Sequence, residues 1–406
     1  MSPNTDFIPF ARPDIGAAEE EAALRVLRSG WLTTAGEARA FETEFAAATG
    51  RRHAIAVSSA TAGLHLALEA AGVGPGDLVA MSPYTFAATA EVVRYFGAHP
   101  LFVDIEPDGF NIDPVRLEAA LQRYAAGDAG DRGAAPGIAA GPPPGPVRAV
   151  IPVHVAGYPC DMDRITEIAG RYDAAVVSDA AHTLVTAEGT PVGAEGDAAV
   201  FSFYATKPIT TGEGGMIVTD RDDLAARMRL MRLHGIDRDV WDRYTAPGAS
   251  WSYAVTEAGF KYNMPDLAAA IGRVQLGRAG ELHRRRRDIA AAYRTGLSDL
   301  DRLILPADHP EHCYHLFILQ LDTDRVPGGR DGFIERMREA GVGTSVHFIP
   351  LHVMPYYRRL YAYTEESFSV SWRRYARAVS LPIYPALTDA QVARIIEAVR
   401  EAADAR

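Results

Sequence analysis

From residue 53 to residue 220 the sequence alternates between short apolar runs and segments with helical periodicity, and this alternation constrains the fold more than any other feature. Apolar runs at 54–57 and 78–81 predict buried strands, and the segments 60–71 and 86–96 between and after them predict helices. Strands that alternate with helices in this way are usually parallel and covered by helices on both faces. The pattern therefore predicts an α/β fold with a mostly parallel sheet between helices.

The alternation ends before a long helical run over 264–297, which we expect to lead into a second domain. Beyond it, strands are predicted over 314–321 and 344–348 among several helices, which is typical of a small α+β domain. A chain of 406 residues is also long enough for two hydrophobic cores. The sequence thus predicts a large domain over 1–272 and a smaller C-terminal α+β domain over 273–406.

Two segments depart from the general pattern. Residues 125–146 are rich in glycine, alanine, aspartate and proline and contain almost no large apolar residue, which predicts a flexible surface insertion within the large domain. The basic run 284–287 lies in the long helical segment, and we expect it to form a solvated helix face.

Composition excludes several classes of function. The net charge of -11 argues against a general binder of nucleic acid or anionic membrane, because such proteins need a basic face. Two cysteines, Cys160 and Cys313, are too few for a disulfide framework, and the scattered histidines show no metal-ligand cluster. Neither a signal segment nor an apolar run of membrane-spanning length is visible. We therefore expect a soluble cytoplasmic protein without a metal site, a membrane or a nucleic-acid partner.

Lys207 is the most informative single residue, because only Lys207 and Lys261 are lysine among 41 basic residues. It follows an apolar run that ends at Ser202 and precedes a glycine turn and a second apolar run, which predicts strand, loop and strand. A guanidinium stays protonated, whereas a partly buried lysine amine can lose its proton and condense with an aldehyde. From this stretch alone, a solvated surface lysine is an equally good interpretation.

Other polar residues lie at predicted strand ends, where ligands collect in an open parallel sheet. The Ser58-Ser-Ala-Thr61 stretch could hold a phosphate at a helix N-terminus, although serine and threonine are also common helix caps. Asp179 could face a protonated ring nitrogen or cap the next turn, and Phe86 could cover a flat ring or fill the core. A phosphate, an aldehyde and a ring nitrogen together describe pyridoxal 5'-phosphate (PLP).

With these residues in view, the sequence resembles the DegT/DnrJ/EryC1/StrS family of fold-type-I, PLP-dependent aminotransferases that act on nucleotide-linked keto-sugars. The resemblance runs from about residue 9 to the C-terminus, interrupted mainly by residues 125–146. It is carried by ordered motifs: Gly30-Trp-Leu-Thr-Thr, Ser58-Ser-Ala-Thr-Ala-Gly-Leu-His65, Pro152-Val-His-Val-Ala-Gly157, Asp179-Ala-Ala-His182, Ser202-Phe-Tyr-Ala-Thr-Lys207, Gly212-Glu-Gly-Gly215 and Gly259-Phe-Lys-Tyr-Asn-Met-Pro-Asp266.

The resemblance implies a role for each matching position. Lys207 would form the Schiff base with PLP, Asp179 would hold the pyridine nitrogen, and Phe86 would stack on the ring. Ala60, Thr61 and Ser202 would contact the phosphate, and His182 would lie beside the cofactor. Asn263 would reach the cofactor of the neighbouring subunit in a homodimer. Thr33, His347 and His352 would line the sugar site. A core or structural role is the alternative for these histidines.

The reaction implied is transfer of an amino group from L-glutamate to a nucleotide-linked keto-sugar. His182 after Asp-Ala-Ala is more similar to members that aminate C4, so we expect dTDP-4-keto-6-deoxy-D-glucose to give dTDP-4-amino-4,6-dideoxy-D-glucose in deoxyaminosugar biosynthesis. A UDP-4-keto-sugar, a 3-keto-sugar and a non-catalytic sensor that binds PLP or a sugar remain alternatives. A dehydratase is disfavoured, because the dehydratases that resemble this chain replace the lysine with histidine.

Overall fold

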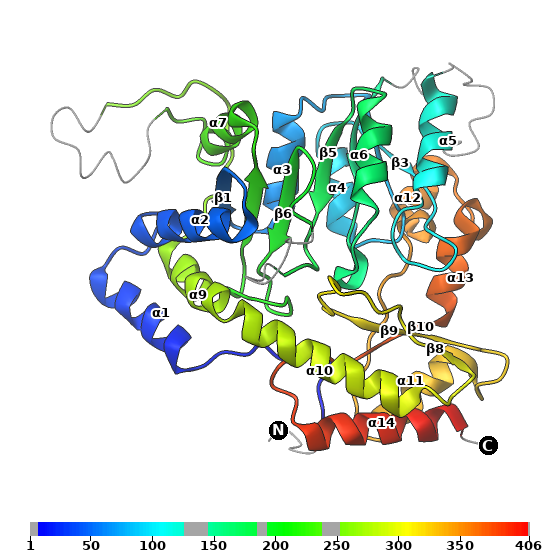
Figure 1. Cartoon of the computed structure of the whole chain (residues 1–406). Coiled ribbons are helices and arrows are strands. Elements are labelled where there is room, and N and C mark those ends of the chain that lie inside the picture. The colour runs from blue at the N-terminus through cyan, green and yellow to red at the C-terminus, as the bar shows by residue number, and fades with distance from the viewer. Residues whose placement is uncertain (1–6, 126–144, 185–192, 238–251, 405–406) are drawn as a thin grey trace.

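Seven strands form the larger of two sheets in the computed structural model, which describes residues 7–125, 145–184, 193–237 and 252–404 (Figure 1). In spatial order they are β1 (His53–Val57), β7 (Gly215–Thr219), β6 (Ala198–Ser202), β5 (Ala175–Asp179), β4 (Val147–Ile151), β2 (Leu78–Met81) and β3 (His99–Phe102). The pairs from β6 to β3 are parallel, and β7 runs antiparallel to both of its neighbours. The predicted mostly parallel sheet is confirmed.

Helices pack on both faces of this sheet because its strands are apolar on both sides. Val200 and Ile217 belong to a core shared with α3 to α7, whereas Phe201 and Met216 belong to a second core shared with α2 and α9. The helices concerned are α1 (Ala17–Ser29), α2 (Gly36–Thr49), α3 (Ala60–Ala70), α4 (Ala87–Tyr95), α5 (Pro114–Ala125), α6 (Met162–Gly170), α7 (Asp222–Met231) and α9 (Asp266–Gly277).

A second sheet of three antiparallel strands lies in the C-terminal part, in the order β10 (Ala378–Leu381), β9 (Phe317–Leu321) and β8 (Leu303–Ile304). Figure 1 shows α10 (Ala279–Leu297) running from α9 toward this sheet, where α11 (Gly329–Glu339) and α14 (Asp389–Asp404) share a separate core with it. Shorter elements complete the chain: η2 (Val155–Gly157), η3 (Leu351–Val353), α12 (Pro355–Tyr361), η4 (Glu365–Phe368) and α13 (Ser369–Arg377). The predicted boundary at residue 272 falls inside α9, and the division into domains stays a prediction.

Two sequence-based expectations are wrong. Residues 344–348 form no strand, and only an isolated bridge joins Ser345 to Ser380. The reason is a contact with a distant segment: the His347 carbonyl accepts a hydrogen bond from the Tyr84 hydroxyl at 2.6 Å instead of from a neighbouring strand. The basic run 284–287 is not a uniformly solvated face either, because Arg286 is 3% exposed and lies on the buried stripe of α10 with Leu282 and Ile289.

Of the predicted flexible insertion, residues 126–144 lie outside the described residues. Within the described segments, no helix is both long enough and apolar enough to span a membrane.

Candidate active site

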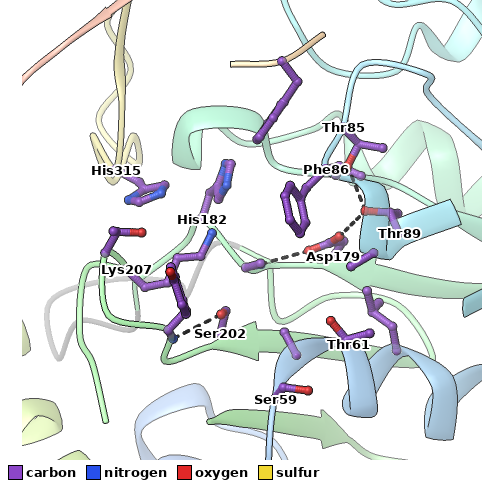
Figure 2. A pocket seen from close by; sticks show the side chains of 18 of the residues that line it. Ser59, Thr61, Thr85, Phe86, Thr89, Asp179, His182, Ser202, Lys207 and His315 are labelled. Atoms are coloured by element: carbon purple, nitrogen blue, oxygen red, sulfur yellow. Dashed lines mark hydrogen bonds between the residues drawn. The ribbon is translucent and has the colours of Figure 1, made fainter. Parts of the chain in front are cut away.

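A cavity of about 530 Å³ lies at the carboxyl ends of β5 and β6, where the chain leaves the large sheet (Figure 2). It brings together residues that are far apart in the sequence. Eight of the predicted site residues line it: Ala60, Thr61, Phe86, Asp179, His182, Ser202, Lys207 and His347. The strand-end residues predicted from the sequence therefore meet in one place.

Lys207 lies on the loop between β6 and β7, where its backbone N–H donates to the Tyr204 carbonyl at 2.9 Å. Burial in the cavity disfavours the ammonium and lowers the pKa of the Lys207 side chain to about 8, although the nearby charge of Asp179 opposes this shift. With that pKa, about a tenth of the amine is neutral at pH 7, against roughly one part in 2,500 for a free lysine. The side chain can therefore act as a nucleophile or a base near neutral pH.

Asp179 is the last residue of β5 and is only 5% exposed. Its Oδ2 accepts a hydrogen bond from Thr89 Oγ1 at 2.8 Å, and its Oδ1 accepts one from the Ala181 N–H at 3.1 Å. Burial raises the pKa of the Asp179 carboxyl, while these two hydrogen bonds and the Lys207 charge oppose that shift. The cavity thus holds a buried carboxylate that would gain from a cationic partner.

The N-terminus of α3 forms one wall of the cavity. Ser59 caps this helix by accepting from the Ala62 N–H at 3.1 Å, while the amides of Ala60 and Thr61 have no acceptor within the helix. Gly215 lies directly against this turn, because a Cβ there would come within 2.7 Å of the Ala60 nitrogen. Free amides at a helix N-terminus attract anions, so this wall suits a phosphate.

Phe86 precedes α4 and is 64% exposed although it lines the cavity. Figure 2 shows its ring beside Asp179, across the cavity from Ser59 and Thr61. An aromatic face left open in this way can cover a flat ligand. A primary amine, a buried carboxylate, free helix amides and an open aromatic ring match the aldehyde, ring nitrogen, phosphate and ring of PLP.

Two predicted histidines are held by hydrogen bonds at the cavity wall. His182 is 6% exposed, its Nδ1 accepts from the Ala156 N–H at 3.2 Å, and its ring stacks on Phe348 with a centroid distance of 5.6 Å. His347 Nδ1 lies 2.9 Å from the Ser380 hydroxyl, and burial lowers the pKa of this imidazole to about 4. Both rings are therefore neutral near pH 7.

Three predicted residues do not line the cavity. Thr33 is exposed on the loop between α1 and α2, and His352 is fully buried against Phe368 with a centroid distance of 5.0 Å. Asn263 donates from Nδ2 to the Thr34 hydroxyl at 2.6 Å and accepts from Lys261 Nζ at 2.6 Å. The contact predicted for Asn263 belongs to a neighbouring subunit and therefore stays a prediction.

Among the polar residues that line the cavity, sequence reasoning did not single out Thr85, Thr89 or His315. Thr89 could have been found, because it lies four residues after Thr85 at the start of a predicted helix and the two hydroxyls are 2.8 Å apart. No sequence pattern pointed to His315, because it precedes β9 among apolar residues and belongs to the C-terminal part of the chain.

Within the described segments, no group of three or more side chains could hold a metal ion.

The comparisons with known proteins agree with this geometry. Residues 13–400 match the DegT/DnrJ/EryC1/StrS aminotransferase family. The spore coat polysaccharide biosynthesis protein SpsC of Bacillus subtilis (strain 168) is 42% identical over 399 residues, which are 97% of each chain. The putative sugar aminotransferase Spr1654 from Streptococcus pneumoniae, in its PMP form, has a TM-score of 0.83 at 28% identity over 98% of both chains. DesI, solved in the presence of its TDP-sugar product, has a TM-score of 0.79 at 33% identity over 98% of this chain and 93% of DesI.

Proposed function

Since this chain belongs to the DegT/DnrJ/EryC1/StrS aminotransferase family, and is therefore a sugar aminotransferase that uses PLP, we propose a specific reaction for it. It transfers the amino group of L-glutamate to C4 of dTDP-4-keto-6-deoxy-D-glucose and forms dTDP-4-amino-4,6-dideoxy-D-glucose. This reaction belongs to deoxyaminosugar biosynthesis.

Two observations support this choice of sugar. DesI, which is 33% identical to this chain, was solved with a TDP-sugar product. The histidine that follows Asp179-Ala-Ala in this chain is the residue expected for C4 rather than C3 amination, and its ring lines the cavity that holds Lys207.

The observation that carries the proposal is the position of Lys207 and Asp179 in the same cavity. When bound, PLP supplies an aldehyde that takes up amino groups and a ring that draws electrons from the reacting carbon. Lys207 is the residue that would hold the aldehyde. Once the amino group of the substrate had displaced Nζ from the aldehyde carbon, the free Nζ would accept and return the proton of the reacting carbon. A lysine pKa near 8 places Nζ close to the optimum for moving a proton near neutral pH.

Asp179 would hold the proton on the ring nitrogen. A carboxylate can do this only while it is ionised, and burial works against ionisation. The hydrogen bonds from Thr89 and from the Ala181 amide counter that effect, so both donors support the role of Asp179.

The remaining residues would place the cofactor. The amides of Ala60 and Thr61 and the hydroxyl of Ser202 would hold its phosphate, and Phe86 would cover its ring. Asn263 would reach the phosphate in the neighbouring subunit, so we propose a homodimer with shared active sites.

The reaction is tested with a panel of nucleotide keto-sugars that includes dTDP-4-keto-6-deoxy-D-glucose, UDP-4-keto-sugars and 3-keto-sugars. Each is incubated with holoenzyme and L-glutamate, and products are identified by mass spectrometry. We expect amination of the dTDP-4-keto-sugar with the highest kcat/KM. Preferred amination of a UDP-sugar or of C3 would overturn the choice of substrate. A protein that binds PLP but does not convert glutamate to 2-oxoglutarate would be a sensor rather than an enzyme.

A further inference from the structure

His315 lines the same cavity as Lys207 but belongs to the C-terminal part of the chain, two residues before β9. Figure 2 shows its ring beside His182 and Lys207. The His315 side chain is 7% exposed, and its ring centroid lies 4.5 Å from that of His182. Its Nδ1 is enclosed and has no hydrogen-bond partner among the described residues. A buried polar atom without a partner in an active-site wall needs an explanation.

The backbone around His315 is held from two sides. The His315 N–H donates to the Ala156 carbonyl at 2.9 Å, and the Ala156 N–H donates to His182 Nδ1 at 3.2 Å. One residue of η2 therefore fixes the positions of both imidazoles. Ala156 has a left-handed backbone conformation, with φ of 62°, which few residues other than glycine adopt. In this conformation its N–H bonds to His182 and its carbonyl bonds to the His315 N–H.

The second support is Arg286, whose guanidinium is buried within the C-terminal part. Its Nη1 donates to the carbonyls of Ile383 at 2.7 Å, Tyr314 at 3.3 Å and His315 at 3.5 Å. No carboxylate among the described residues lies within ion-pair distance of Arg286, and burial lowers its pKa to about 10. Burying a cation without a counter-ion costs folding free energy. The hydrogen bonds from Arg286 offset part of that cost and hold the backbone of the segment that carries His315.

The hydrogen bonds also decide where the protons of the two imidazoles lie. His182 Nδ1 accepts from an amide, so the proton of its neutral ring is on Nε2. A proton on the enclosed Nδ1 of His315 would have no acceptor, and an unpaired donor is costlier than an unpaired acceptor, so that proton is also on Nε2. Burial and the positive charge of Lys207 lower the pKa of both rings far below the ordinary value, so both stay neutral.

A neutral N–H donor suits a neutral oxygen. Among the described residues of one subunit, no arginine lines this cavity and Lys207 is its one lysine, so a carboxylate or a diphosphate held by His315 would have no second charge partner from that subunit. The reacting carbon must lie next to Lys207, and in a 4-keto-hexose the neighbouring ring carbon, C3, carries a hydroxyl. Resting on the proposed function, we propose that His315 Nε2 donates a hydrogen bond to the sugar hydroxyl next to the reacting carbonyl, which makes His315 a specificity-determining residue of the acceptor half-reaction.

The two half-reactions separate this role from a structural one, because glutamate carries no hydroxyl. The variants are His315→Phe, which keeps the ring without its nitrogens, and His315→Asn, which keeps one donor. His65→Phe is the matched control, because His65 is also buried, at 6% exposure, but does not line the cavity. The glutamate half-reaction is followed by loss of the visible absorbance of the pyridoxal form, and the sugar half-reaction by its return.

We expect His315→Phe to lower kcat/KM of the sugar half-reaction by about 10- to 100-fold, with the glutamate half-reaction changed less than about threefold. His315→Asn should restore part of the loss. The affinity of the pyridoxal form for the aminated nucleotide sugar, measured by titration calorimetry, should fall in parallel in His315→Phe and not in His65→Phe.

The 3-deoxy analogue of dTDP-4-keto-6-deoxy-D-glucose completes a double-mutant cycle. The wild type should discriminate against it by about 10- to 100-fold, and His315→Phe should not discriminate. Equal losses in both half-reactions, a loss confined to glutamate, or full discrimination in His315→Phe would each overturn this inference. If the wild type aminates neither sugar, the proposed substrate fails instead, which is a distinguishable result.

Discussion

Replacing Thr89 with valine removes one of the two hydrogen bonds that reach the Asp179 carboxylate from the described residues. Valine keeps the shape of threonine but puts a methyl group where Oγ1 now lies 2.8 Å from Asp179 Oδ2. The Ala181 N–H, at 3.1 Å from Oδ1, would remain as a donor to the carboxylate. The substitution therefore tests how the protein keeps a buried carboxyl ionised.

The expected size follows from the strength of a hydrogen bond to a charged group, about 1.5 to 3 kcal/mol. Loss of this bond to the ionised form should raise the Asp179 pKa, already raised by burial, still further. At pH 7 the unfolded chain has this carboxyl ionised, so the cofactor-free variant should lose about 1.5 to 3 kcal/mol of unfolding free energy. The loss should shrink as pH falls through the raised pKa of the folded-state carboxyl, because below it the carboxyl is protonated in the folded wild type and in the folded variant alike.

Urea unfolding of the cofactor-free protein at pH 7 and at pH 5 measures the stability change, and titration with PLP measures the affinity for PLP, which should fall as well.

Thr85→Val is the matched control. The Thr89 hydroxyl donates its proton to Asp179, so Thr85 must be the donor in the 2.8 Å hydrogen bond between the two threonine hydroxyls. Replacing Thr85 with valine therefore removes a hydrogen bond between neutral groups, which contributes about 0.5 to 1.5 kcal/mol. Thr89→Ser should restore the wild-type values. Wild-type stability and PLP affinity in Thr89→Val, or equal effects of the two valine substitutions, would refute the reasoning.

Three further predictions concern the same site and its support. In the cofactor-free protein, chemical modification of Lys207 should reach half its maximal rate near pH 8, because burial lowers its pKa; a midpoint near 10 would contradict this, and peptide mass spectrometry measures it. Asp179→Asn should shift that midpoint to lower pH, since the Asp179 charge favours the ammonium, and an upward shift would be inconsistent with their interaction. Gly63→Ala should destabilise the protein by about 1 to 3 kcal/mol in urea unfolding, because the new Cβ would lie 2.6 Å from Val200 Cγ1. In Gly277→Ala, where nothing lies within 4 Å, stability should be unchanged or higher, and equal losses in both glycine variants would argue against close packing of α3.

Much of the site could be predicted because local patterns place it. In a mostly parallel sheet, the carboxyl ends of the strands lie along the same edge, and each apolar run ends there. Asp179, Ser202 and the turn before Ala60 follow such runs, so they were expected to lie near one another. Lys207 was conspicuous because the chain otherwise uses arginine for positive charge. These inferences needed only the order and spacing of residues.

The residues that sequence reasoning misplaced depend on contacts between distant segments. His315 reaches the cavity because of hydrogen bonds to Ala156 and Arg286, which are separated from it by 159 and 29 residues, and no local pattern encodes these contacts. Arg286 itself is buried because three carbonyls converge on it, whereas a run of four arginines normally indicates solvent. His352 stands close to His347 in sequence, but η3 directs it away from the cavity and into an aromatic core.

The most direct test of the account uses the two lysines of the chain. Protein reconstituted with PLP is reduced with borohydride, digested and mapped by mass spectrometry. The peptide that contains Lys207 should carry the added mass of the reduced cofactor, the peptide that contains Lys261 should not, and glutamate added before reduction should abolish the labelling. Labelling of Lys261 instead, or no labelled peptide from a protein that aminates its sugar, would contradict the central role of Lys207.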